Sequence, residues 1–284
     1  MRKIGYVLPL FLSVALLLGA CGAVSDKTDG TQNAAKTVDI TLPDDGVHAD
    51  NATVINGGEL TVLKSYEGFE GLTVEINGGT LDLTASDDGI NAAGGNDNSG
   101  FGGPRGGDAF GSASSSSYIK ITGGTVYVNA DGDGVDSNGS LKVSGGNLFV
   151  SGPTSNGDGA LDFDGNGIIS AGTVIAVGSS GMAQNFGTSS TQGSALISVG
   201  NRNASDKVTL TDEKGNVLAE YEPEKAYSTV VISCPAMKQG GTYTVSAGDF
   251  SETFTLTSLI YGGGAPNGGD RPNGGRPCGG GFGR

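Results

Sequence analysis

The sequence is poor in cysteine, histidine and basic residues, and each shortage excludes a class of protein. Only 3 of the 284 residues are cysteine and 1 is histidine, and no CxxC pair or Cys/His cluster occurs. Zinc fingers and iron–sulfur sites are therefore not expected. The chain has 16 lysine and arginine residues against 30 aspartate and glutamate residues, and its formal net charge is -14. Such a chain repels a nucleic acid backbone, so we expect no nucleic acid partner.

Helical periodicity is also missing after the N-terminal leader. The chain contains 53 glycines, together with many serine, threonine, asparagine and aspartate residues. This composition favours turns and short strands over helices. The sequence therefore predicts an all-β fold.

The leader, residues 1–20, has the form of a bacterial lipoprotein signal peptide. It has a basic start, an apolar run at 4–18, and a Leu-Gly-Ala-Cys box that ends at Cys21. We expect lipidation of Cys21, a tether at 21–36, and an extracellular protein that is lipid-anchored to the bacterial cell membrane. An ordinary secretory signal or an uncleaved transmembrane anchor remains an alternative.

Internal repetition is the strongest signal in the chain. The repeated segments are INGGELTV (55–62), INGGTLDL (76–83), ITGGTVYV (121–128), VSGGNLFV (143–150) and the weaker ISAGTVIA (169–176). The glycine pairs begin 21, 45 and 22 residues apart, and the long interval equals two repeats or one repeat plus an insert at 94–117. A repeat of about 22 residues with three short strand-like pieces is what one coil of a parallel β-helix requires. We predict such a solenoid at 37–200.

Strand alternation assigns an inside and an outside to each coil. Aliphatic residues recur at alternate positions and are predicted to stack inside, whereas charged and aromatic residues between them point outward. Tyr127 and Phe149 share one outer column, and Lys120 and Lys142 share another. Aromatic rings can stack on sugars and lysines can meet uronate carboxylates, so these four are candidate carbohydrate-binding residues. Alternatively, another part of the chain covers the rings and the lysines only relieve an acidic surface.

Acidic residues recur at the corners of the predicted coils. LDFDGNGIIS (161–170) resembles half of an EF-hand, but position twelve of that loop is Thr173 and the flanks have no helical period. The segment instead belongs to a series of Asp-Gly and Glu-Gly corners, whose stacked carboxylates suit Ca²⁺. The candidate ligands are Asp45, Glu67, Asp87, Asp88, Asp131, Asp133, Asp136, Asp158 and Asp162. Alternatively, these residues are only good turn formers.

The pattern changes after the repeats. Residues 201–260 contain alternating strands and a hairpin around 213–216, which predicts a β-rich cap on the last coil. The glycine-rich tail at 261–284 is predicted to be disordered. Cys234 and Cys278 could pair in an oxidising compartment.

Several segments resemble a bacterial carbohydrate-binding family described from clostridia. They are SYEGFEG, ASDDGINAAGG, DGDGVDSNG, ALDFDGNG, the INGG turns and GSSGMAQNF, and the likeness extends from about Val38 to Leu256. The resemblance implies a right-handed parallel β-helix similar to that of polysaccharide lyases. It also implies calcium in the coils and binding of cellulose or of acidic sugars such as polygalacturonate.

Together these observations predict a cell-surface lipoprotein that binds polysaccharide without cleaving it. A calcium-dependent polysaccharide lyase is the first alternative, but its basic residue is hard to assign, because Arg105 lies in the insert and Arg202 follows the repeats. Ser-His-Asp catalysis would rest on His48 alone, in the first corner. A structural or adhesive surface protein is the second alternative.

Overall fold

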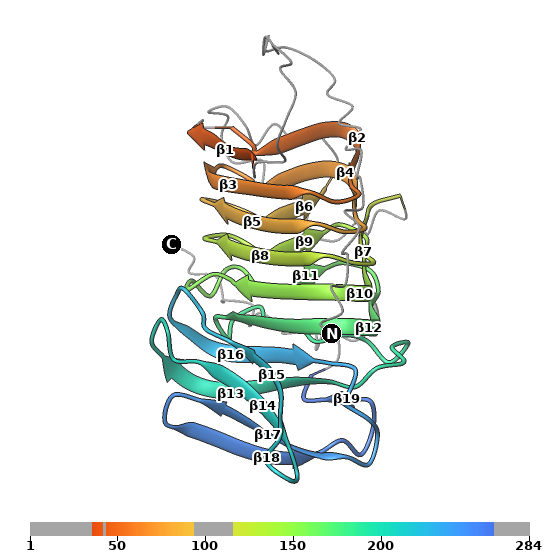
Figure 1. The fold of residues 1–284 in the computed structure, drawn as a ribbon, viewed down its shortest axis with the longest axis vertical. Helices are drawn as coiled ribbons and strands as arrows, with labels where there is room; N and C mark the ends of the chain where they lie inside the picture. The colour runs from red at the N-terminus through yellow and green to blue at the C-terminus, as the bar shows by residue number, and fades with distance from the viewer. Residues whose placement is uncertain (1–35, 42–43, 94–115, 264–284) are drawn as a thin grey trace, which may run out of the picture.

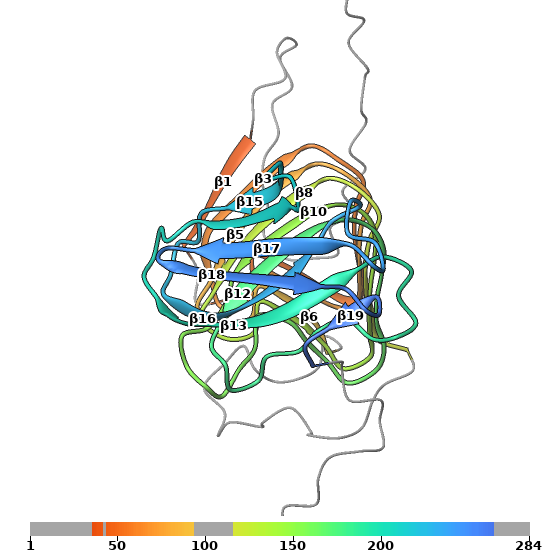
Figure 2. The same cartoon turned by 90° about the horizontal axis from the view of Figure 1, so that it is seen from below.

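The structure, a computed structural model, describes residues 36–41, 44–93 and 116–263. Within these ranges the strands form one sheet of 15 and one sheet of four, and no helix is present, as the composition predicts. Figure 1 shows the strands of the large sheet stacked as successive rungs, from β1 and β2 at one end to β12 near the small sheet. Figure 2 shows this sheet curling around the core.

Parallel pairing joins most rungs along three ladders. The first contains β2 (Val47–Ile55), β4 (Phe69–Ile76), β7 (Tyr118–Ile121), β10 (Ser140–Ser151) and β12 (Gly167–Gly178). The second contains β1 (Lys36–Thr41), β3 (Glu59–Ser65), β5 (Thr80–Ala85), β8 (Thr125–Ala130) and the second halves of β10 and β12. The third joins the start of β4 to β6 (Ile90–Ala92), β9 (Val135–Ser137) and β11 (Asp162–Phe163).

The register of these ladders agrees with the repeat alignment. Glu75 pairs with Lys120, and Lys120 pairs with Lys142, along the first ladder. Tyr127 pairs with Phe149 along the second. The insert therefore interrupts the sequence between two rungs without disturbing their pairing.

The predicted inner columns form the buried core. They contain Thr53, Val74, Ile119 and Leu141; Ile55, Ile76, Ile121, Val143 and Ile169; and Leu81, Val126, Leu148 and Val174. Each aliphatic side chain lies above its equivalent on the next rung, so the core continues from coil to coil. Burying one such side chain contributes about 1.5–3 kcal/mol.

The glycine pairs form the corner between the first two ladders. Gly124, Gly146 and Gly172 have φ of +84°, +76° and +96°, in the left-handed region that favours glycine. A Cβ on Gly146 would lie 2.7 Å from the carbonyl carbon of Gly123 and from the oxygen of Gly124. The corners of successive rungs therefore stack backbone on backbone.

The large sheet is mixed, so the prediction of a parallel solenoid holds only in part. After β12 the chain reverses: β16 (Tyr227–Ser233) pairs antiparallel with both β12 and β13 (Ser194–Arg202), and β13 also pairs with β19 (Ile260–Tyr261). The next glycine pair, at 240–241, is followed by a strand whose pairs are antiparallel, so the parallel series does not continue there. The predicted boundary at residue 200 falls inside β13.

The small sheet has the order β15 (Val217–Tyr221), β14 (Val208–Asp212), β17 (Thr242–Ala247) and β18 (Phe250–Thr255), and all its pairs are antiparallel. It contains the predicted hairpin, because β14 pairs with β15. Asp212 accepts hydrogen bonds from the backbone of Lys214 and Asn216 in the turn. A second apolar core, which includes Ile175, Val230 and Leu256, lies between this sheet and the last rungs.

Several predictions fall outside the residues that the structure describes. They concern the signal peptide at 1–20, Cys21, the tether before Lys36, Arg105 and the tail from 264 onward, which includes Cys278. Cys234 lies within the described residues as a buried free thiol. In the described ranges, no helix has the length and apolar character needed to cross a membrane.

Candidate functional site

The Asp-Gly and Glu-Gly corners form a regular acidic edge because their glycines have no room for a side chain. A Cβ on Gly89 would lie 2.6 Å from the oxygen of Gly134, and one on Gly134 would lie 2.5 Å from the oxygen of Ala160. The residue before each glycine therefore stacks on its equivalent in the next rung. We call this series the corner row: Asp45, Glu67, Asp88 and Asp133. The sequence alignment placed Asp158 next in this row, but Gly134 N donates to Gly159 O, so Gly159 takes that place and Asp158 lies one residue before it.

Carboxylates of the corner row bind the backbone of the next rung. Asp45 Oδ1 accepts a hydrogen bond from Glu67 N at 3.3 Å, and Asp88 Oδ1 accepts one from Asp133 N at 2.7 Å. Asp133 Oδ1 likewise accepts one from Gly159 N. These acids thus connect successive rungs, which a turn formed only within one rung would not do.

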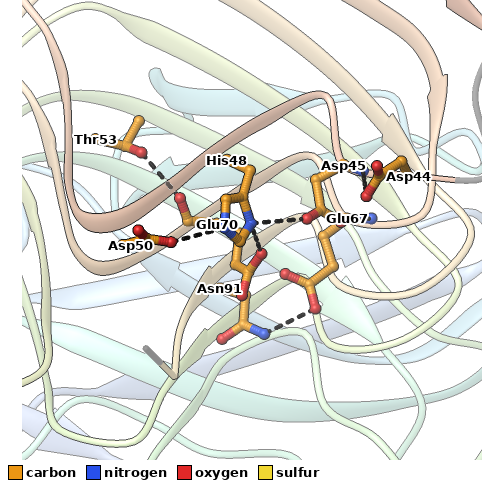
Figure 3. A network of polar contacts seen from close by, with 8 residues as sticks. All are labelled: Asp44, Asp45, His48, Asp50, Thr53, Glu67, Glu70 and Asn91. Atoms are coloured by element: carbon orange, nitrogen blue, oxygen red, sulfur yellow. Dashed lines mark hydrogen bonds and ion pairs between the residues drawn. The ribbon is translucent and has the colours of Figure 1, made fainter. Parts of the chain in front are cut away.

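A second acidic series runs beside the corner row on the short ladder. Backbone register places its members in one column, which we call the strand row: His48, Glu70, Asn91, Asp136 and Asp162. Glu70, Asn91 and Asp136 are 1%, 2% and 7% exposed. Asn91 Nδ2 donates to Glu67 Oε1 at 3.0 Å and so joins the two rows (Figure 3).

Two groups of side chains in these rows are close enough to share a cation. The ligand atoms of Asp88, Asp133 and Asp136 lie within 4.8 Å of one another, as do those of Asp45, His48 and Glu70. The first group offers only carboxylate oxygens, which fits calcium.

Asn91 lies between the two groups in the strand row, paired in register with Glu70 on one side and Asp136 on the other. Its Oδ1 is buried and accepts no hydrogen bond from the part of the chain that the structure describes. A buried acceptor of this kind is costly unless a donor or a cation lies nearby. The donor set of the rows therefore fits a bound cation.

Burial and crowding change the protonation of the rows. The pKa of Glu67 is raised to about 10, mainly by burial and also by the charges of Glu70, Asp45 and Asp88, although the hydrogen bond from the Asn91 amide lowers it. Glu67 is therefore a neutral carboxyl group near pH 7 in the absence of a cation, which reduces repulsion along the row.

The remaining predicted metal ligands have other neighbours. Asp87 accepts a hydrogen bond from the Tyr66 hydroxyl, which raises the pKa of Tyr66. Asp131 lies 3.1 Å from Lys225 Nζ. Asp87 thus contacts a hydroxyl group, and Asp131 contacts an ammonium group.

Asp158 and Asp162 also have polar neighbours at the far end of the rows. Asp158 accepts a hydrogen bond from Ser155 Oγ at 2.9 Å, and Asp162 accepts one from Gln184 Nε2 at 3.0 Å. Among the nine predicted ligands, the structure thus brings Asp88, Asp133 and Asp136 into one group and places Asp45 in the other.

The metal-ligand prediction left out His48, Glu70 and Asn91. The available signal was their spacing, because each follows a corner acid by three residues, at 45, 67 and 88. Alternation alone points them outward, so the sequence did not reveal that Glu70 and Asn91 are buried.

The predicted aromatic pair forms a real stack, but a third ring joins it. The ring centroids of Tyr127 and Phe149 are 5.3 Å apart with planes at 19°, and those of Phe149 and Tyr221 are 5.2 Å apart at 23°. Tyr221 comes from β15 and its hydroxyl lies 2.8 Å from Ser151 Oγ. Phe149 is therefore covered on one side, whereas Tyr127, at the end of the stack, is 37% exposed.

The two predicted lysines lie on the other side of the glycine corner from the rings. Lys120 Nζ is 3.4 Å from Glu75 Oε2, and Tyr118 donates a hydrogen bond of 2.7 Å to Glu75 Oε1. Lys142, next in the column, is exposed. The four candidate carbohydrate-binding residues thus form two separate surfaces.

Comparison of the chain with family models, with curated proteins and with solved structures finds no match. The resemblance to the carbohydrate-binding family therefore stays a prediction that rests on the sequence segments given above.

Proposed function

We propose that this protein is a cell-surface lipoprotein that binds polysaccharide, without cleaving it, on a calcium-stabilised solenoid. The observation that carries this proposal is the three-ring stack whose last member, Tyr127, remains exposed on a flat ladder of parallel strands. In the finer form of the proposal, the parallel ladders are the coils of a right-handed parallel β-helix, and lipid on Cys21 anchors it outside the bacterial cell.

The direction of the stack suggests where a sugar ring binds. One face of Tyr127 meets Phe149, so its other face is turned toward the neighbouring rung, where Asp82 pairs with Tyr127 in register. Asp82 is short and exposed. A pyranose ring over Asp82 would continue the stack on Tyr127, and the Asp82 carboxylate would accept hydrogen bonds from its hydroxyl groups.

The charge near this position favours a neutral glycan such as cellulose. Asp82 would repel the carboxylate of a polyuronate bound at the same place. A polygalacturonate-like chain would instead use the exposed Lys142, on the other side of the glycine corner, or calcium. We therefore assign cellulose-like chains to the aromatic stack and treat pectate as the competing ligand.

Calcium in this proposal occupies the group formed by Asp88, Asp133 and Asp136. Support comes from its all-oxygen ligands and from the buried Asn91 Oδ1 beside it in the strand row. The ion would offset repulsion between adjacent coils and so stabilise the fold on which the aromatic stack is built.

The contacts of Arg202 and Lys120 support binding rather than lyase chemistry. A lyase needs an unprotonated arginine or lysine near the calcium-bound uronate. Arg202 forms an ion pair with Asp249, and Lys120 forms one with Glu75, so both groups are already engaged with a carboxylate.

The test is retention of the full chain on insoluble cellulose and on a pectate gel, with calcium and again with EDTA. We expect retention on cellulose that Tyr127→Ala reduces at least tenfold and that EDTA weakens. Val217→Ala, which removes an exposed apolar side chain from β15 outside the stack, should leave retention unchanged.

Two other outcomes would assign the protein to a different functional class. Ultraviolet-absorbing unsaturated uronates in the supernatant would indicate a lyase. No retention on either glycan in either buffer would refute polysaccharide binding and favour the structural or adhesive alternative.

A further inference from the structure

The group formed by Asp45, His48 and Glu70, in the first rungs, differs chemically from the all-oxygen group of Asp88, Asp133 and Asp136, the calcium group. Asp45 precedes β2, His48 lies in β2, and Glu70 lies opposite His48 in β4. His48 Nδ1 is 3.1 Å from Asp45 Oδ2 and also contacts Glu70 Oε2 (Figure 3). His48 is the only histidine of the chain. Its imidazole contacts two carboxylates, those of Asp45 and Glu70.

The arrangement offers three electron-pair donors around one point. A single Nδ1–H group can donate well to only one of the two carboxylate oxygens that face it. A cation between the three groups would instead accept a lone pair from each. The ligand atoms lie within 4.8 Å of one another, a separation that ligands of one ion can have.

The buried Asn91 acceptor, which lies between this group and that of Asp88, Asp133 and Asp136, also favours a cation in the rows. Asn91 pairs in register with Glu70, and Figure 3 shows it beside Glu67 and Glu70. Its Oδ1 is buried and accepts no hydrogen bond within the described ranges. Positive charge near Glu70 would stabilise this oxygen as well.

The donor set selects the class of metal. Ca²⁺ takes oxygen ligands, whereas imidazole nitrogen with two carboxylates suits a divalent transition metal such as Zn²⁺. The side chains of Asp45 and Glu70 are 5% and 2% exposed, whereas that of His48 is 40% exposed. Two ligands are therefore held by the fold, and the third leaves a solvent-facing side for entry of the ion and for a water ligand.

We propose that Asp45, His48 and Glu70 form a binding site for a divalent transition-metal ion of the Zn²⁺ type, separate from the all-oxygen group of Asp88, Asp133 and Asp136. The sequence reading argued against zinc because the chain has no Cys/His cluster. That criterion does not apply to this site, because two of its ligands are carboxylates and Glu70 is 22 residues from His48. The proposal does not depend on polysaccharide binding.

Calorimetric titration of the full chain, purified without a histidine tag and freed of metal, tests the site with ZnCl₂ and with CaCl₂. We expect Zn²⁺ to bind this site in preference to Ca²⁺. His48→Gln should weaken Zn²⁺ binding at least tenfold and leave Ca²⁺ binding unchanged, whereas Asp133→Asn should weaken only Ca²⁺ binding. Co²⁺ in place of Zn²⁺ should give a visible spectrum that His48→Gln alters.

Asp50→Asn is the matched control. The Asp50 carboxylate lies 3.6 Å from His48 Nε2 with a side chain that is 78% exposed, so its loss changes the local charge without removing a ligand. It should leave Zn²⁺ affinity within about twofold of the native value, as expected for a screened surface charge. Thermal unfolding of each variant in EDTA identifies any that fails to fold, and Asp45→Asn, which removes another ligand of the same site, replaces His48→Gln if that variant does not fold.

Three results would overturn the proposal. They are no Zn²⁺ binding by the native chain, equal Zn²⁺ affinity of His48→Gln and the native chain, and an equal loss in Asp50→Asn and His48→Gln. The first two exclude a histidine-dependent site, and the third indicates only diffuse attraction to an acidic surface.

Discussion

The stacked glycine corners allow a quantitative test of how closely the rungs approach. Replacing Gly146 by alanine has two costs. The φ of +76° places the new side chain in the left-handed region, which costs about 1–2 kcal/mol. The Cβ would also lie 2.7 Å from backbone atoms of Gly123 and Gly124, which cannot move aside as a flexible side chain could. Crowding of this kind costs about 1–3 kcal/mol.

Two other glycines separate these costs. Gly215 has φ of +82° in the turn between β14 and β15, but a Cβ there would meet nothing within 4 Å. Gly215→Ala should therefore lose only the conformational part, about 1–2 kcal/mol. Gly157 is exposed, has no positive φ and also has open space around a Cβ. Gly157→Ala should change the free energy of unfolding by less than about 0.5 kcal/mol.

Thermal unfolding measures the difference directly. In a domain of 150–250 residues, 1 kcal/mol shifts the Tm by about 2–4 °C. Taking about 3 kcal/mol for Gly146→Ala, we expect its Tm to fall by about 6–12 °C. Gly215→Ala should fall by about 2–8 °C, always less than Gly146→Ala in the same buffer. Equal Tm values for the two variants would refute the close backbone stacking of the corners.

Three more predictions concern the core, the tyrosine of the stack and the calcium group. Leu148→Ala empties a fully buried position of the inner column and should lower the free energy of unfolding by about 2–5 kcal/mol in urea titration; a loss below about 1 kcal/mol would contradict this packing. Burial raises the pKa of Tyr221 to about 12 from 10.0. The stability gained by keeping this hydroxyl neutral is complete below about pH 10 and is lost, by about 2–3 kcal/mol, as the pH rises to about 12. Urea titrations at about pH 9 and about pH 11 measure how much the free energy of unfolding falls between the two, and Tyr221→Phe should reduce this fall. An equal fall in both proteins would show that it does not come from Tyr221. Calcium at about 100 times its Kd should stabilise the native chain by about 2.7 kcal/mol, and Asp133→Asn should abolish this gain; an equal gain in both proteins would move the ion away from this group.

The parts of the fold that repeat could be predicted from the sequence. Each inner column has aliphatic residues at the same place in every repeat, so alternation alone identified Ile76, Ile121 and Val143 as core. The glycine pairs fixed the alignment, because only glycine fits their corner. Repetition makes each rung a check on the others, and a misreading in one repeat is corrected by the next.

The parts that occur once could not be predicted in the same way. Nothing in the repeat indicates that β16 turns back along β12 or that Tyr221 covers Phe149. These contacts join residues 51 to 72 positions apart, and only the three-dimensional packing of the C-terminal strands decides them.

The candidate site likewise has a part that could be predicted from the sequence and a part that could not. The corner row follows from the repeat, so Asp88 and Asp133 could be placed together from the sequence. The strand row was also visible as a series a few residues after each corner acid, from His48 to Asp162. Its role was harder to predict, because its members change from histidine to glutamate, asparagine and aspartate along one column, and only Asp136 and Asp162 were expected to be ligands.

The reversal of direction at β16 sets a limit on growth. A parallel array of rungs can in principle extend by adding another strand, from the same chain or from another molecule, to its open edge. Here residues 174–177 of β12 have β10 on one side and the antiparallel β16 on the other. Earlier in β12, the carbonyl oxygens of Gly167 and Ile169 accept hydrogen bonds from the backbone of Gly187 and Thr191, so these parts of the edge are also occupied within the chain. The number of parallel rungs is therefore fixed at this end by the chain itself, and the parallel array terminates here instead of serving as a template for a fibre.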